Sequence, residues 1–137
     1  LFNTTFNIYY FVKSCKDNFE NLRCILIDEA HFLTKAQVAQ VIAVTKDFEI
    51  AALNYGLRSD FLGEPFEGSQ YLLTWADEIV EIKANSNLNI KDLTGAGDLF
   101  AAGYLHGVVN NLSTKESLLK GTELSSKIIQ KIGARLS

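Results

Sequence analysis

Two adjacent carboxylates, Asp28 and Glu29, follow a short apolar run of the chain. The run, residues 24–27, is rich in branched side chains and is typical of a strand buried on both faces in a parallel sheet. Ligands of such sheets bind beyond the carboxyl ends of the strands. One carboxylate there can hold Mg²⁺ through water beside nucleotide phosphates, and a second can take a proton from an acceptor hydroxyl. From these residues alone, two acids that simply end a strand in solvent remain the alternative.

A glycine-rich turn that opens into a helix forms the second candidate site. Gly95 and Gly97 let the backbone approach an anion closely, and the open N–H groups around Ala96 favour negative charge. Asp98 follows at the helix start, where it can accept a hydroxyl proton while the N–H groups stabilise a transferring phosphoryl group. These residue types predict phosphoryl transfer, and an ordinary glycine-containing helix start is the alternative.

The first part of the chain, residues 1–84, predicts an α/β fold with a partial parallel sheet. Thr34 and Gln37 have the spacing of a capping box at a helix start. The order strand, helix, strand implies that the strands are parallel. The expected strands are residues 24–27, 50–54 and 78–83. The expected helices are residues 6–16, residues 69–77 and a helix that begins after Thr34. The apolar stripe of this last helix consists of Val38, Val41, Ile42, Thr45 and Phe48.

The second part, residues 85–137, predicts a pair of helices. An asparagine-rich seam opens it, and the net charge changes from −5 in the first part to +2 in the second. One helix is expected over residues 95–109, and another after the capping box of Ser113 and Glu116. The expected apolar stripes are Leu99, Ala102, Leu105 and Val109 in the first helix and Leu118, Gly121, Ser125, Ile128 and Ile132 in the second, where Gly121 and Ser125 permit a close crossing and Gly133 caps the end.

Composition excludes several classes of protein. With 47% hydrophobic and 21% charged residues, the 137-residue chain is typical of a folded domain. A net charge of −3 without a Lys/Arg cluster argues against nucleic-acid and anionic-membrane partners. No apolar run approaches the ~20 residues of a membrane span and no signal peptide is evident, so we expect a cytoplasmic protein with reduced thiols. Cys15 and Cys24 match no zinc-site spacing, and the lack of Met predicts that the true start lies upstream or has been removed.

Three blocks of the first part carry a family resemblance. Residues 25–33, 54–69 and 72–77 read ILIDEAHFL, NYGLRSDFLGEPFEGS and LLTWAD. Together they resemble the type II thymidine kinases, over about residues 1–83. The resemblance implies a P-loop kinase sheet, ATP as phosphoryl donor, thymidine as acceptor and assembly into a homo-oligomer. It implies that Glu29 is the base for the thymidine 5′-hydroxyl, that Asp28 holds Mg²⁺ through water, and that the thymine pocket is lined by Phe32, Leu57, Phe61 and Phe66.

The first part departs from the thymidine kinase pattern in three places. No G-x-x-x-x-G-K-[ST] loop precedes Asp28, although that loop holds the ATP phosphates. The zinc ribbon and the loop that closes over thymidine do not follow Lys83, so no zinc site is expected. His31 stands where the family usually has Gln, which we interpret as a tolerated polar exchange; a group that titrates near phosphates is the alternative. We therefore expect this chain to be inactive by itself.

The second part carries a different resemblance. Residues 92–107 read DLTGAGDLFAAGYLHG. With the tail, they resemble the second signature of the ribokinase-like (PfkB) kinases, especially the adenosine-kinase-like members, over about residues 86–137. The resemblance implies that Gly95, Ala96 and Gly97 form an anion hole for the phosphates and that Asp98 is the base. Leu93 departs mildly from the pattern, and most of that family's sheet and its substrate lid have no counterpart here.

Three functions therefore compete. The first is an ATP-dependent nucleoside kinase, thymidine kinase by ancestry. The second is a remnant of a PfkB-type carbohydrate or adenosine kinase, and the third is a non-catalytic fusion or decayed gene product. Residues 28–31 also spell the ATPase box of one helicase class, but no basic surface or further helicase motif accompanies them.

Overall fold

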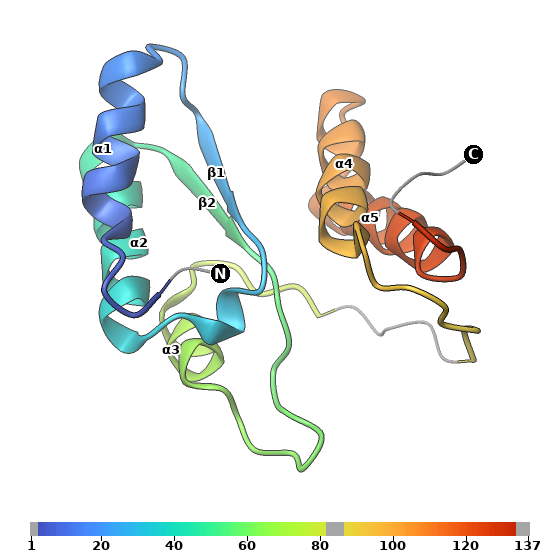
Figure 1. Cartoon of the computed structure of the whole chain (residues 1–137). Coiled ribbons are helices and arrows are strands. Elements are labelled where there is room, and N and C mark those ends of the chain that lie inside the picture. Colours follow the sequence, from blue (N-terminus) through green and yellow to red (C-terminus); the bar gives the residue numbers. More distant parts are fainter. Residues whose placement is uncertain (1–2, 82–86, 134–137) are drawn as a thin grey trace. The chain divides into compact units, whose positions relative to one another are not determined.

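The computed structural model describes residues 3–81 and 87–133 and divides the chain into two compact units, Leu1–Ile79 and Val80–Ser137 (Figure 1). Within the described ranges, no helix is long and apolar enough to cross a membrane.

The first unit is built around a two-stranded parallel sheet, as the order of its elements predicts. Cys24 pairs with Ala51 and Ile27 with Asn54, and a helix connects the two strands. The elements are α1 (Ile8–Asn18), β1 (Cys24–Ile27), the 3₁₀ turn η1 (Ala30–Phe32), α2 (Lys35–Phe48), β2 (Ala51–Asn54) and α3 (Glu67–Trp75).

Helix α2 begins at the predicted capping box. The Thr34 hydroxyl accepts the Gln37 N–H at 3.2 Å, and the Gln37 side chain accepts the Thr34 N–H at 3.1 Å. The same Gln37 side chain is buried and donates to the carbonyls of Asn3 and Phe6. The cap therefore starts the helix and also ties the N-terminal segment to it.

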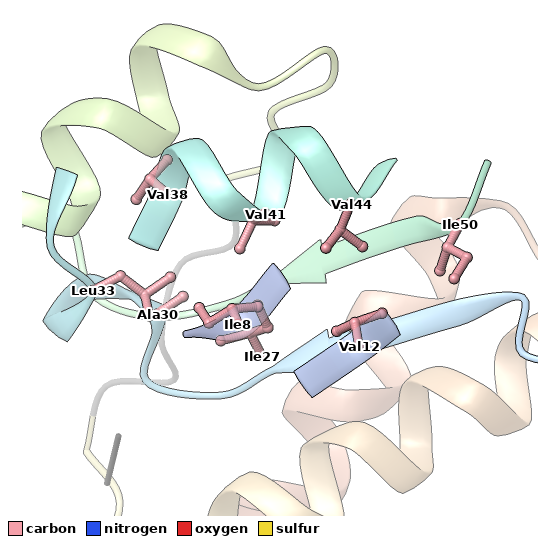
Figure 2. Packing of buried hydrophobic residues seen from close by; sticks show 9 residues of the cluster. All are labelled: Ile8, Val12, Ile27, Ala30, Leu33, Val38, Val41, Val44 and Ile50. Carbon is pink, nitrogen blue, oxygen red and sulfur yellow. The ribbon is translucent and has the colours of Figure 1, made fainter. Parts of the chain in front are cut away.

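The core of the first unit lies between the helices α1 and α2 and the two strands. Both helices lie on the same side of the sheet (Figure 1). Figure 2 shows the side chains of the cluster converging between these elements. The cluster consists of Ile8, Val12, Ile27, Ala30, Leu33, Val38, Val41, Val44 and Ile50.

Three predictions for the first unit are wrong in detail. The strands are not buried on both faces: β1 is half-buried up to Ile27 and β2 is half-buried after an exposed Ala51, because α1 and α2 share one side of the sheet. Val44, absent from the predicted stripe of α2, is completely buried, whereas Thr45 is half-buried. Residues 78–81 form no strand, since no third strand pairs with β1 or β2 in the described part, and residues 82–83 lie outside it.

The second unit is a pair of closely packed helices, α4 (Ala96–Val109) and α5 (Thr114–Ile128). The predicted capping box of Ser113 and Glu116 starts α5. Gly103 and Gly107 of α4 lie directly against the backbone and side chain of α5 at Gly121 and Ser117. The predicted close crossing at Gly121 is therefore confirmed.

The predicted apolar stripe is wrong in most positions of α4, whereas in α5 it is wrong only at Ile132. Ala102, Leu105 and Val109 are exposed, and glycines form the buried face of α4 instead. The reason is that α4 is apolar around most of its circumference, so its sequence does not distinguish the packed face. In α5, Ser117 and Ser126 are buried in addition to Leu118, Gly121 and Ile128, whereas Ile132 is 85% exposed. Gly133 lies beyond the end of α5 and is not its cap.

Candidate active site

The first candidate site lies at the carboxyl ends of the two paired strands. The Tyr55 N–H donates to the Ile27 carbonyl at 3.1 Å, and the Ala30 N–H donates to the Tyr55 carbonyl at 3.0 Å. Asp28 and Glu29 lie between these two bonds, on an exposed turn. The sheet therefore presents both carboxylates at the edge where α/β proteins bind ligands.

The backbone of this turn has an unusual conformation at Glu29. Its φ and ψ of 54° and 34° are left-handed, which is uncommon for a residue other than glycine. The Asp28 carboxylate accepts the Glu29 N–H at 2.8 Å and supports the turn. Glu49 at the end of α2 has the same left-handed conformation, so it is the position of Glu29 beyond β1, and not its backbone alone, that makes it a candidate.

His31 lies beneath the turn, and no prediction placed it in the core. It is 3% exposed; its Nδ1 accepts the Leu57 N–H at 3.2 Å and its Nε2 lies 3.2 Å from Glu29 Oε2. The feature of the sequence that could have indicated a role for His31 is its position, two residues after the candidate base Glu29. Both ring nitrogens have partners, so His31 takes part in the structure of the turn; a glutamine amide could meet the same two partners, and the interpretation as a tolerated polar exchange stays a prediction.

The predicted thymine-pocket residues divide into two groups. The Phe32 and Phe66 rings meet edge to face, with centroids 5.5 Å apart, and both contact the His31 ring. Leu57 joins this group through its backbone bond to His31. Phe61 is 93% exposed in the loop between β2 and α3, and the structure does not bring it to the other three.

The exposure of these side chains distinguishes them from ordinary core residues. Phe32 is 57% and Leu57 61% exposed, beside a turn that carries two carboxylates. The Ser69 hydroxyl donates to the Leu57 carbonyl at 2.5 Å and fixes the start of the loop against α3. An exposed apolar group rimmed by polar side chains is typical of a binding surface.

The second candidate site is the start of α4. Gly95 has a φ of 79°, a left-handed value that suits glycine, and its carbonyl already accepts the Leu99 N–H. The N–H groups of the first helical turn after it, including those of Gly97 and Asp98, have no partner within the helix and can meet an anion. Asp98 is exposed in that turn. The structure therefore places the left-handed Gly95 and the exposed Asp98 together at the start of α4.

Asp92 tethers the turn that leads to α4. One carboxylate oxygen accepts the Thr94 N–H at 2.9 Å and the Thr94 hydroxyl at 2.7 Å, and the other accepts the Gly133 N–H at 2.9 Å. These bonds stabilise the ionised form, first through the Thr94 side chain, and lower the Asp92 pKa to about 2. The segment before α4 is thereby joined to the segment after α5.

The Asp92 tether predicts a local acid transition. Because its folded-state pKa is depressed, the tether is intact above about pH 4 and opens as the pH falls through about 2. In NMR titrations, the amide signals of Thr94 and Gly133 should shift together with a midpoint of about 2. Asp92→Asn should remove this transition and Asp98→Asn should not. A midpoint near 3.8, the ordinary value, or separate midpoints for the two amides would contradict the tether.

The carboxylates of the described residues could bind a metal ion only together with ligands from water and substrate phosphates. In the described ranges, no three His, Cys, Asp or Glu side chains gather into a group that could hold a metal ion alone. Asp28 is exposed, and one of its oxygens is left over from the bond to the Glu29 N–H. One such carboxylate, acting through water and together with substrate phosphates, is the usual protein contribution to a Mg²⁺ site.

Comparison with known proteins separates the chain into two matches. The family model for thymidine kinase matches residues 3–91. The chain belongs to the thymidine kinase family. The thymidine kinase of Aliivibrio fischeri is 54% identical over 83 residues, which are 61% of this chain and 43% of that protein. The thymidine kinase of Photorhabdus laumondii is 61% identical over 62 residues, which are 45% of this chain and 31% of that protein. That of Legionella pneumophila (strain Lens) is 49% identical over 82 residues, which are 60% of this chain and 39% of that protein.

The thymidine kinase match spans only part of this chain and only part of each longer relative. The chain spans about two fifths of the length of the curated thymidine kinases that it matches. The model for pfkB family carbohydrate kinases matches residues 65–137, and the two matches overlap at residues 65–91. No solved structure matches the chain significantly.

Proposed function

We propose that residues 3–81 are the nucleoside-accepting part of a thymidine kinase. The reaction is phosphoryl transfer from ATP to the thymidine 5′-hydroxyl, with Glu29 as the base that takes the hydroxyl proton. Asp28 holds Mg²⁺ through water, and Phe32, Leu57 and Phe66 contact the thymine. Phe61 contributes to this pocket if the loop that carries it folds over the base.

The observation that carries this proposal is the position of Glu29. Its carboxylate lies at the end of β1, 56% exposed, next to the exposed Phe32 and the loop that starts at Leu57. A base must reach a substrate hydroxyl while the apolar part of the substrate has a surface to contact. The turn provides both within one unit.

ATP binding requires a part that the 137 residues do not contain. Without a G-x-x-x-x-G-K-[ST] loop, no backbone cradle or Lys meets the phosphates beside Asp28. The proposal therefore assigns phosphate binding to sequence outside these residues and predicts that they do not phosphorylate thymidine by themselves.

The start of α4 supports a second candidate function. Its open N–H groups, the left-handed Gly95 and the exposed Asp98 suit a PfkB-type transfer to a sugar or adenosine hydroxyl. In that case Gly95, Ala96 and Gly97 hold the transferring phosphoryl group and Asp98 is the base. The third possibility is that the join of the two parts has no catalytic role.

A phosphoryl-transfer assay with three acceptors tests the proposal. The natural polypeptide that contains these residues is incubated with Mg²⁺ and labelled ATP and with thymidine, adenosine or ribose. We expect product with thymidine, and none from residues 1–137 alone. Product with adenosine or ribose only would support the PfkB-type function, and no product with any acceptor would support the non-catalytic one.

A further inference from the structure

The His31 ring is a buried link between the backbone of one loop and the carboxylate of Glu29. Its side chain is 2% exposed, whereas that of Glu29 is 56% exposed. One nitrogen contacts the Leu57 N–H and the other contacts Glu29 Oε2, each at 3.2 Å. The two partners thus lie on opposite edges of the same ring.

These two contacts determine where the His31 proton lies. A backbone N–H can only donate, so Nδ1 must keep its lone pair to accept from Leu57. The proton of a neutral ring is then on Nε2, the nitrogen that lies 3.2 Å from Glu29 Oε2. A doubly protonated ring would place its Nδ1–H against the Leu57 N–H.

The ring has little freedom to turn away from these partners. Its centroid lies 4.1 Å from that of Phe32 and 4.5 Å from that of Phe66. A Cβ on Gly56 would lie 2.6 Å from Nδ1, so the absence of a side chain there lets the ring approach the loop. The loop between β2 and α3 and the start of α3 also carry Arg58, Asp60, Glu64 and Glu67. The Asp60 carboxylate accepts the Leu62 and Glu64 N–H groups, and the Glu67 carboxylate accepts the Lys35 N–H.

We propose that His31 is a positioning residue, which, as a neutral ring with its proton on Nε2, holds the Glu29 carboxylate in the orientation needed to accept the substrate proton. The effect of His31 on catalysis rests on the proposed function. The link itself, from the Leu57 N–H through His31 to Glu29, is independent of that function.

Nitrogen-15 NMR of His31 in the 137-residue chain tests the link directly. At neutral pH we expect an unprotonated Nδ1 and a slowly exchanging Nε2–H proton. Glu29→Ala should speed exchange of this proton, and Glu64→Ala, which removes an exposed carboxylate from the loop between β2 and α3, should not. A protonated Nδ1, or exchange unaltered by Glu29→Ala, would overturn the inference.

Kinetics of the natural polypeptide test the consequence for catalysis. His31→Leu should lower kcat for thymidine by about 10²-fold and change KM less, because leucine keeps an apolar packing surface for Phe32 and Phe66 but removes the contact to Glu29 Oε2. His31→Gln should restore much of kcat, since the amide can accept from Leu57 and donate to Glu29. Equal kcat in the wild type and His31→Leu would overturn the positioning role. A wild type without thymidine activity would instead overturn the proposed function, and the NMR result would still decide the link.

Discussion

Glu29→Gln is expected to lower kcat for thymidine phosphorylation by about 10²- to 10⁴-fold, the usual contribution of a general base. This corresponds to about 3–5 kcal/mol of barrier at 1.36 kcal/mol per decade. The amide has the shape of the carboxylate and can still accept from His31 Nε2, so the turn keeps its geometry. What it loses is the ability to take the proton of the 5′-hydroxyl.

The measurement is steady-state kinetics of the natural polypeptide with thymidine and ATP. Glu64→Gln is the matched control, because it removes an exposed carboxylate of the same unit that lies outside the site. Asp98→Asn should leave thymidine turnover unchanged if the two candidate sites act independently. A similar loss of kcat in Glu29→Gln and Asp98→Asn would contradict their independence.

Gly103→Leu is expected to separate α4 from α5. A Cβ at this position would lie 2.6 Å from the Lys120 carbonyl oxygen and 2.7 Å from the Gly121 Cα. Both are backbone atoms, so no side chain can turn aside and the helices must move apart. We expect the free energy of unfolding of this unit to fall by about 3 kcal/mol, the upper part of the usual range for overpacking. Glycine normally weakens a helix interior, so helix propensity alone predicts a gain in stability.

Denaturant unfolding, combined with hydrogen exchange of the α4 and α5 amides, measures this effect. Ala102→Leu is the control: it enlarges the neighbouring residue on the exposed side of the same helix and should change stability little. Exchange in α1, α2, β1 and β2 reports whether the first unit is affected. If Gly103→Leu and the wild type had the same denaturant midpoint of unfolding, the helices would not cross at these glycines.

Several features of the candidate sites could be predicted from neighbouring residues alone. The branched run at residues 24–27 indicated β1 and placed Asp28 and Glu29 at its carboxyl end. The capping boxes at Thr34 and Ser113 indicated the starts of α2 and α5. Gly95 indicated the turn before α4, whereas Gly97 lies in the first turn of that helix. The two capping boxes join residues at most four apart, so these helix starts are visible in the sequence. For β1 only the apolar run is visible locally, because its hydrogen bonds are made with Ala51–Asn54.

Other features were decided by contacts between distant residues. His31 meets Leu57 across 26 positions, and this contact converts an apparently neutral substitution into a partner of Glu29. The third expected strand does not form over residues 78–81, because a strand exists only beside a hydrogen-bonding neighbour.

The sequence by itself determined the thymidine kinase family, the positions of the two carboxylate turns, the strand β1 and the starts of α2 and α5. Tertiary structure alone decided that glycines, and not Leu105 or Val109, form the packed face of α4. It also placed His31 in the core and gave Glu29 its left-handed backbone. The physical reason is that helix starts depend on hydrogen bonds between nearby residues, whereas strand pairing, burial and close approach depend on which distant surfaces meet.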